Sequence, residues 1–328
     1  MQALEQPIRF ATIGRSQIAQ LWLAAAQTLP DFRLCATYSR QIADAREFAQ
    51  QYGAQRAYDN LEAMAKDPDV DAVYIASPNL FHYEQTLMML RHGKHVLVEK
   101  PMAVTRAQAE DMFATADANG CVLLEATRNV LNPAMRRIRD ALPQLGVLRR
   151  AHLHFCQYSS KYDRFKQGEM TNTFNPALAT GGLMDLGVYT VEAMVYLFGA
   201  PQRITAVHHA LPHGWDAMGT LIADYESMQA VLTYSKITQG YAPSEIQGEK
   251  GALQIGHITE LNNLRIRLRT GEEQIIASEP PGSDLVHETR AFIDMIKGVR
   301  DAKEMRHCSL TAMGIMEEAR AQFSRMDK

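Results

Sequence analysis

The sequence predicts two domains of different class. Residues 1–126 are expected to form an α/β domain with a doubly wound parallel sheet, and residues 127–328 an α+β domain with a large, mostly antiparallel open sheet. The length of 328 residues is about twice that of one ordinary domain. The first part alternates short apolar runs with helical periods, which is typical of βαβ units. The second part alternates polar and apolar residues between Gly, Asp, Asn and Pro, as half-buried antiparallel strands do.

The elements of the first domain follow from this periodicity. Strands are predicted at Ile8–Ile13, Leu34–Tyr38, Ala72–Ala76, His95–Val98 and Val122–Leu124. Helices are predicted from Ile18 to Leu29, after Tyr38 as far as Tyr52, from Thr86 to His92 and from Thr105 to Asn119. Gly93 and Gly120 stand where helices commonly end. Strands and helices therefore alternate throughout this part.

The second domain is predicted from a different pattern. Helices are expected at Asn132–Leu142, Leu183–Leu197, Leu285–Lys297 and Leu310–Met326. Residues 151–157 alternate as one strand, residues 203–277 contain several more strand-like segments, and residues 159–180 are expected to be a loop. The sequence contains no internal repeat.

The composition argues against several classes of function. Thirty-four basic and 37 acidic residues give a net charge of −3, so a polyanionic partner such as nucleic acid is not expected. The four cysteines lie far apart, and no apolar run approaches the ~20 residues that cross a bilayer. His152 and His154 share a strand face but have no adjoining carboxylate motif, so no metal site is expected. No signal peptide is visible, and we expect a cytoplasmic protein that does not bind a membrane.

A phosphate-binding turn follows the first strand. The string Gly14-Arg15-Ser16-Gln17-Ile18-Ala19 matches G-x-G-x-x-[G/A] except that Ser16 replaces the second glycine. Gly14 allows the tight turn, and the free amides of the next helix point at phosphate oxygens. An isolated glycine before a helix is usually only a turn. Here the strand before it and the helix after it favour dinucleotide binding.

The end of the second strand indicates which dinucleotide is bound. An acidic residue there would bind the ribose 2′-hydroxyl of NAD, but the sequence is Tyr38-Ser39-Arg40-Gln41 and the nearest carboxylate, Asp44, is expected well inside the next helix. Ser39 can hydrogen-bond a 2′-phosphate and Arg40 can pair with it. The pattern favours NADP(H) over NAD, with a solvated Arg40 as the alternative reading.

Polar segments follow two further strands, Ser77-Pro78-Asn79 and Glu99-Lys100-Pro101. Ligands of open α/β sheets lie beyond the carboxyl ends of the strands, so both segments are expected at the cofactor. Lys100 beside a nicotinamide could donate a proton to a substrate oxygen, and Glu99 would favour its charged form. The alternative is an ordinary Glu-Lys pair on a turn.

These motifs, together with Gly181-Gly182-Leu183-Met184-Asp185-Leu186-Gly187-Val188-Tyr189, resemble the glucose–fructose oxidoreductase/inositol dehydrogenase/rhizopine catabolism (Gfo/Idh/MocA) family. The resemblance covers the whole chain and is greatest to the dimeric dihydrodiol dehydrogenase subgroup, which has Tyr where many relatives have His. It implies an NAD(P)-binding Rossmann domain and a C-terminal sheet often used for dimerisation. It also implies that Lys100 and Tyr189 lie near the substrate carbonyl, and that the peptide before Pro101 can be cis.

Asp185 and Tyr189 also stand out without the resemblance. Residues four apart on a helix share one face, and a carboxylate and a phenol on an apolar helix need partners when buried. A core tyrosine and a structural acceptor remain the alternative. We assign Tyr189 as general acid/base, assisted by Lys100, with Asp185 orienting the substrate or the lysine. A neighbouring cation would help the phenol to ionise.

The remaining expected site residues belong to two groups. The expected cofactor-binding residues are Gly14, Ser16, Gln17, Ile18, Ser39, Arg40, Ser77, Pro78, Asn79, His82, Glu99, Lys100 and Pro101. The weaker substrate-binding candidates are Arg128, Tyr158, Tyr162 and Asn175.

The sequence thus predicts an NADP(H)-dependent oxidoreductase that acts on a sugar, polyol or diol and forms a homodimer or higher oligomer through its second domain. Two other functions remain open. One is a cofactor-binding sensor that has lost turnover, which the presence of Lys100, Asp185 and Tyr189 together disfavours. The other is a redox-assisted glycosidase with tightly held NAD, which the apparent 2′-phosphate preference disfavours.

Overall fold

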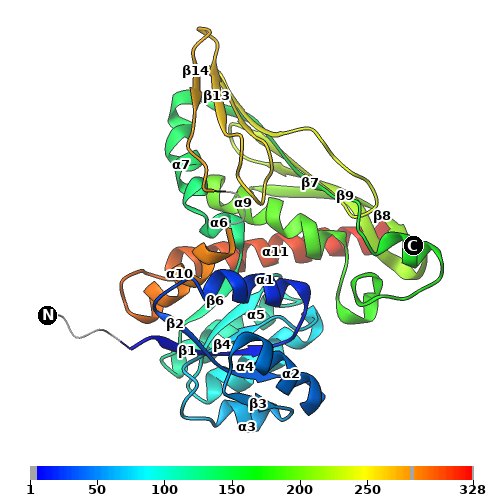
Figure 1. Cartoon of the computed structure of the whole chain (residues 1–328). Coiled ribbons are helices and arrows are strands. Elements are labelled where there is room, and N and C mark those ends of the chain that lie inside the picture. The colour runs from blue at the N-terminus through cyan, green and yellow to red at the C-terminus, as the bar shows by residue number, and fades with distance from the viewer. Residues whose placement is uncertain (1–5, 281–283, 327–328) are drawn as a thin grey trace, which may run out of the picture. The chain divides into compact units, whose positions relative to one another are not determined.

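The computed structural model describes residues 6–280 and 284–326. Two units account for the chain: Met1–Ala126 with Leu285–His307, and Thr127–Asp284 with Cys308–Lys328. Residues 285–307 therefore belong to the same unit as the N-terminal strands. Each unit is built around one sheet (Figure 1).

The first unit contains a six-stranded sheet in the order β3-β2-β1-β4-β5-β6, with every neighbouring pair parallel. This is the doubly wound order in which the strand sequence reverses between β1 and β4, and it confirms the predicted class. The strands are β1 (Ile8–Ile13), β2 (Phe32–Tyr38), β3 (Arg56–Tyr58), β4 (Ala72–Ile75), β5 (His95–Glu99) and β6 (Leu123–Ala126). The edge strand β3 was not predicted, because three half-buried residues are too short to show a period.

Helices flank this sheet (Figure 1). They are α1 (Gln17–Ala26), α2 (Ile42–Tyr52), α3 (Leu61–Ala65), α4 (His82–Arg91), α5 (Arg106–Ala118) and α10 (Asp284–Ile296). Trp22 of α1 stacks on Tyr74 of β4 with ring centroids 3.9 Å apart. Phe292 of α10 lies 6.0 Å from Phe10 of β1, which explains why this late helix belongs to the first unit.

The second unit contains an eight-stranded sheet in the order β14-β13-β12-β11-β7-β10-β9-β8. Among its pairings only that of β7 with β10 is parallel, which confirms a mostly antiparallel sheet. The strands are β7 (Leu148–Cys156), β8 (Arg203–Leu211), β9 (Trp215–Asp224), β10 (Gln229–Ser235), β11 (Ser244–Gly248), β12 (Gly251–Ile255), β13 (Arg265–Leu268) and β14 (Glu273–Ile275).

The helices of this unit are α6 (Arg128–Leu131), α7 (Pro133–Ala141), α8 (Tyr162–Lys166), α9 (Val188–Phe198) and, from Cys308 onward, α11 (Lys303–Met326). Helix α9 packs against β7 and β10, and Phe323 of α11 stacks on His208 of β8 at 4.1 Å. The opposite sheet face carries exposed apolar side chains, Val207, Met218 and Ile222 among them.

Two predictions for this unit were wrong in detail. Residues 159–180 are not simply a loop, because they contain α8 and two 3₁₀ turns, Asn172–Phe174 and Pro176–Leu178. Phe165 packs on Phe174 at 5.1 Å, and Phe174 lies 4.4 Å from Trp215, so aromatic contacts order the segment. The helix expected from Leu183 begins instead as a π-helical turn, Leu183–Gly187, before α9.

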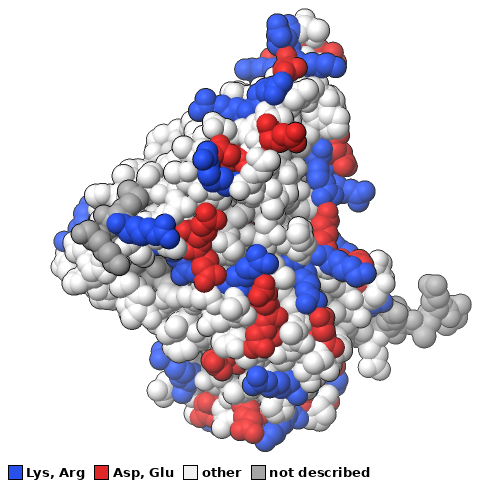
Figure 2. All heavy atoms as spheres, turned by 180° about the vertical axis from the view of Figure 1, so that it is seen from behind, with Lys and Arg blue, Asp and Glu red and all other residues white. Residues whose placement is uncertain are grey.

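The surface carries both signs of charge. On the face in Figure 2, basic and acidic side chains are interspersed, in keeping with the net charge of −3. Among the described residues, no helix has the length and apolar character needed to cross a membrane.

Candidate active site

The Gly14 turn follows β1 and passes beside the end of β4, and the strand order reverses between these two strands. Gly14 has φ +107°, and a Cβ placed on it would lie 2.6 Å from the carbonyl oxygen of Ala76, just beyond β4. Residues with a side chain rarely adopt this backbone angle. The Ala76 oxygen belongs to the backbone, so it cannot move away from an added Cβ as a flexible side chain could. Only glycine therefore fits where the turn passes this closely beside the next strand.

Ser16 is the N-cap of α1. Its side-chain oxygen accepts a hydrogen bond from the N–H of Ala19 at 3.4 Å, which explains a serine at the position of the second motif glycine. Ser16 and Gln17 are exposed and Ile18 is half-buried. The N-terminal amides of this ten-residue helix suit a pyrophosphate, because their hydrogens and the helix dipole favour an anion.

The end of β2 differs in one respect from the prediction. Asp44 does not lie well inside α2 but in its first turn, where its Oδ2 is 2.6 Å from Nη2 of Arg15. Asp44 thereby reaches the phosphate-binding turn, and its charge is matched by Arg15. Arg40 is exposed and Ser39 is half-buried, so a 2′-phosphate would find one unshielded guanidinium and one hydroxyl here.

His82 connects the two predicted strand-end segments. Its ring is buried, with Nδ1 2.9 Å from the carbonyl oxygen of Pro101 and Nε2 2.8 Å from that of Ser77. Burial lowers the pKa of this imidazole, and the two carbonyls oppose that shift. The Ser77 hydroxyl donates to Gln85 at 2.6 Å. The segment before α4 and the segment after β5 are thus held together through one side chain.

Hydrogen bonds from neighbouring residues hold the Glu99-Lys100-Pro101 segment in place. Glu99 is buried and accepts a hydrogen bond from the Tyr74 hydroxyl at 2.5 Å. Beyond it, the Lys100–Pro101 peptide is cis, as the resemblance implied. Glu125, which the sequence did not single out, accepts from the N–H of Met102 at 2.8 Å. Lys100 itself is half-buried.

In the second unit, Asp185 lies in the π-helical turn and Tyr189 one turn later in α9. The Asp185 side chain is 32% exposed and forms an ion pair with Lys236, whose side chain is only 10% exposed. Sequence reasoning missed Lys236, since a single lysine after a strand gives no signal. Lys236 is therefore an ion-pair partner of Asp185 that the sequence did not indicate.

Side chains of strands β9 and β10 contact the π-helical turn and fix its position. Asp216 of β9 accepts from the N–H of Leu183 at 2.7 Å and from the Tyr234 hydroxyl at 2.9 Å. The ring of Tyr234 packs so closely that a Cβ on Gly182 or Gly187 would lie 2.9 or 3.0 Å from it. Two of the three glycines of the G-G-x-x-x-D-x-G motif, Gly182 and Gly187, thus lie against one tyrosine of the sheet, and Gly181 lies against Asp216.

Tyr189 has a cation over its ring. The guanidinium carbon of Arg128 is 5.5 Å from the ring centroid, and Phe155 meets the ring edge-on at 5.6 Å. Arg128 is itself held by Asp284 at 2.9 Å. The Tyr189 backbone is fixed by Asn129, which donates to its carbonyl at 3.1 Å. Of the four substrate candidates, Arg128 is the one brought next to Tyr189 by these contacts.

The other substrate candidates belong to the ordered segment around α8. Tyr158 and Tyr162 meet edge-on at 5.5 Å, and the Tyr158 hydroxyl donates to Asp163 at 2.7 Å. Asn175 accepts from the N–H of Ala177 at 3.1 Å. The polar groups of Tyr158 and Asn175 are thus engaged within the segment, and Tyr162 takes part through its ring.

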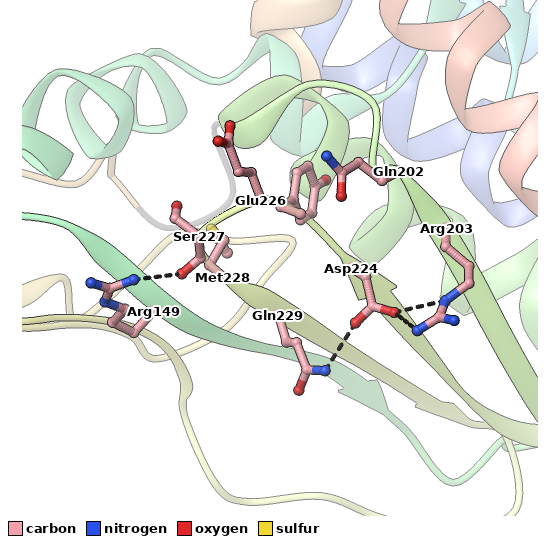
Figure 3. A pocket seen from close by; sticks show the side chains of 9 residues that line it. Arg149, Gln202, Arg203, Asp224, Glu226, Ser227, Met228 and Gln229 are labelled. Atoms are coloured by element: carbon pink, nitrogen blue, oxygen red, sulfur yellow. Dashed lines mark hydrogen bonds and ion pairs between the residues drawn. The ribbon is translucent and has the colours of Figure 1, made fainter.

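A polar depression of about 520 Å³ lies at the β9–β10 turn (Figure 3). It contains none of the predicted site residues. Asp224 at its centre accepts from Arg203 at 2.6 Å and from Gln229 at 2.9 Å. Arg203 and Asp224, which both line the depression, form an ion pair with each other. Within the described ranges, no group of three His, Cys, Asp or Glu is arranged to hold a metal ion.

Comparison with known proteins places both units. The Gfo/Idh/MocA model described as an oxidoreductase family with an NAD-binding Rossmann fold matches residues 8–127, and the GFO/IDH/MocA C-terminal domain model matches residues 135–254. The chain is 43% identical over 318 residues to the scyllo-inositol 2-dehydrogenase (NADP(+)) IolU of Bacillus subtilis (strain 168), covering 96% of this chain and 97% of that protein.

Two further relatives have known names. A trans-1,2-dihydrobenzene-1,2-diol dehydrogenase of Mus musculus is 32% identical over 255 residues, covering 76% of this chain and 74% of the relative. The solved structure of KijD10, a 3-ketoreductase from Actinomadura kijaniata in complex with NADP and TDP-benzene, superposes with a TM-score of 0.86 at 25% identity, covering 97% of this chain and 98% of the other.

Proposed function

Because the chain belongs to the Gfo/Idh/MocA family and is an NAD(P)-dependent oxidoreductase acting on CH–OH groups, we propose that it transfers hydride between NADP(H) and a ring carbon of a cyclic polyol or sugar. The observation that carries the proposal is the Asp185–Tyr189 segment. It presents a partly exposed carboxylate beside Lys236 and a phenol beside Arg128. A carboxylate accepts hydrogen bonds from substrate hydroxyls, and a phenol near a cation can exchange a proton.

The preference for NADP(H) over NAD rests on the first unit. Ser39 and the exposed Arg40 follow β2, and both suit a 2′-phosphate. Asp44 lies beside the phosphate-binding turn, and its charge is matched by Arg15. The name of the B. subtilis relative and the ligand of the ketoreductase structure, both NADP, agree with this preference.

The proposed chemistry divides the work between residues. The nicotinamide accepts or supplies the hydride when the cofactor is bound. Tyr189 acts as general acid/base toward the reacting oxygen, assisted by Lys100, and Arg128 holds the Tyr189 ring in place through its cation–π contact. Asp185 accepts hydrogen bonds from neighbouring substrate hydroxyls. Tyr158, Tyr162 and Asn175 contribute contacts to the same substrate.

We also propose that the chain forms a homodimer through the open face of its second sheet. Val207, Met218 and Ile222 are exposed there, with 48%, 36% and 37% of their surfaces accessible. The register pairs Thr205 with Ile222 and Val207 with Thr220, so these side chains project from one face. Static light scattering of the wild type and of Ile222→Asp tests this: a dimer that becomes monomeric supports the interface, and a monomeric wild type refutes it.

The function is tested by assaying the full-length protein with scyllo-inositol, other polyols, aldoses and trans-diols, each with NADP and with NAD. Turnover of a cyclic polyol or sugar, with NADP giving the higher kcat/KM, is the expected result. NADPH binding without turnover of any compound would instead indicate a sensor. Glycoside cleavage without net NADPH formation would indicate redox-assisted hydrolysis. Either outcome refutes the proposal.

A further inference from the structure

Lys236 lies just beyond β10, and both of its backbone polar groups are hydrogen-bonded. Its N–H donates to the carbonyl oxygen of Ala217 at 2.9 Å, and its carbonyl oxygen accepts from the N–H of Ser159 at 2.9 Å. The backbone on both sides of the residue is therefore part of the sheet framework. The side chain has little freedom left, because only 10% of it is exposed.

The side-chain ammonium of Lys236 forms an ion pair with the Asp185 carboxylate. A buried ammonium is costly unless a charge or several acceptors compensate it, and here the compensation comes from a carboxylate that is itself 32% exposed. The pair is thus asymmetric: the cation is enclosed by protein and the anion can be reached from solvent. The enclosed partner sets the position of the accessible one.

The same strands fix the rest of the π-helical turn. Asp216 holds the N–H of Leu183 at 2.7 Å, and the Tyr234 ring packs on the motif glycines. Tyr234 and Lys236 are two residues apart at the end of β10, so a single strand end determines both where the turn lies and where the Asp185 carboxylate is held. Without Lys236, the turn would keep its backbone anchor at Asp216, while the carboxylate would lose the buried ammonium that fixes its direction.

We infer that Lys236 is a positioning residue for substrate recognition: it orients the Asp185 carboxylate so that this group accepts hydrogen bonds from the hydroxyls of a polyol. The inference rests on the proposed function and deepens it, since it assigns the polyol-recognising role to Asp185 and explains how a side chain in a non-α-helical turn is held in one direction. Lys236 does not itself touch the substrate.

The test compares Lys236→Met and Lys236→Arg with the wild type, using scyllo-inositol and NADP as probes. Losing the orientation of a charged hydrogen-bond acceptor is expected to reduce kcat/KM for the polyol about 10- to 100-fold, mainly through KM. NADPH affinity, measured by fluorescence, should not change. Lys236→Arg keeps the charge and should recover part of the loss.

A matched control separates positioning from stability. Lys94 is also buried, and its amine donates to the carbonyl oxygens of Asp67 and Val70 at 2.6 and 2.8 Å. Lys94→Met should therefore lower the thermal midpoint as Lys236→Met does, but leave the polyol KM unchanged. In a double-mutant cycle, Lys236→Met should add little to Asp185→Asn, because Lys236 acts on the substrate only through Asp185.

Each outcome decides the inference. An active Lys236→Met protein with a wild-type KM overturns it, even if that protein is less stable. If Lys236→Met does not fold, Lys236→Arg decides, and an unchanged KM in that variant also overturns it. A wild-type protein that turns over no polyol with either cofactor refutes the proposed function and this inference together, so the two failures are distinguishable.

Discussion

Replacing Gly14 by alanine tests the geometry of the phosphate-binding turn directly. At φ +107° a residue with a Cβ pays about 1–3 kcal/mol of backbone strain. The new carbon would also lie 2.6 Å from the Ala76 carbonyl oxygen, well inside the ~3.3 Å at which carbon and oxygen atoms meet. Forcing an extra methyl into such a contact costs about 1–3 kcal/mol more. The sum predicts a destabilisation of about 2–6 kcal/mol.

The matched control for this substitution is Gly53→Ala. Gly53 has φ +77° but no atom within 4 Å of its Cβ position, so it carries only the backbone cost of about 1–2 kcal/mol. Urea denaturation measures both variants, and NADPH fluorescence titration measures cofactor affinity. We expect Gly14→Ala to weaken NADPH at least about tenfold because the turn must move, and Gly53→Ala to leave it unchanged. Equal stability and equal affinity in the two variants would refute the close approach of the turn to Ala76.

Four further substitutions test individual residues. Tyr189→Phe should reduce turnover about 10²- to 10⁴-fold with unchanged NADPH affinity; undiminished turnover would mean that another group transfers the proton. Arg40→Asp should weaken NADP binding and relatively favour NAD, and an unchanged ratio of the two affinities would remove Arg40 from the site. Asp44→Asn frees Arg15 for the phosphate and should strengthen NADP binding a few-fold, which a titration at low salt would detect; weaker binding would contradict this. The pKa of His82 is lowered from 6.5, chiefly by burial. The unfolded chain therefore binds a proton at this residue more readily than the folded protein does. The contribution of His82 to the free energy of unfolding is fully present above about pH 6.5 and is lost as the pH falls below that value. His82→Gln should therefore show a shallower loss, by up to about 1.4 kcal/mol per pH unit, in urea titrations between pH 7.5 and 5, and identical slopes would count against the buried neutral ring.

Several parts of the fold could be predicted because they produce a local, periodic pattern of apolar residues in the sequence. The strand Ile8–Ile13 was placed with the bounds that the structure has, since a buried parallel strand is a continuous apolar run. The short strand Arg56–Tyr58 was missed because its stability comes from pairing at the sheet edge. The π-helical turn at Leu183–Gly187 was likewise missed, because one shifted hydrogen-bond ring leaves no trace in hydrophobic spacing.

In the candidate site, too, some features could be predicted from the sequence and others could not. The phosphate-binding turn and the Glu99-Lys100-Pro101 segment could be located from sequence, since each is a short motif that follows a recognisable strand. The sequence did not show that Asp44 reaches Arg15, because that contact depends on where α2 begins and on how close β1 and β2 lie. It also did not show that the Tyr74 hydroxyl donates to Glu99, because that contact joins two neighbouring strands of the sheet.

The sequence by itself determined the class of both domains, the dinucleotide-binding turn and the residue types available for proton transfer, because these depend on neighbours along the chain. Only the tertiary structure decided which charges meet. Lys236 and Asp185 are separated by 51 positions, and Arg128 and Tyr189 come from different helices. Such pairs form only when strands and helices pack against one another, and packing depends on the shape of the whole core rather than on any local pattern.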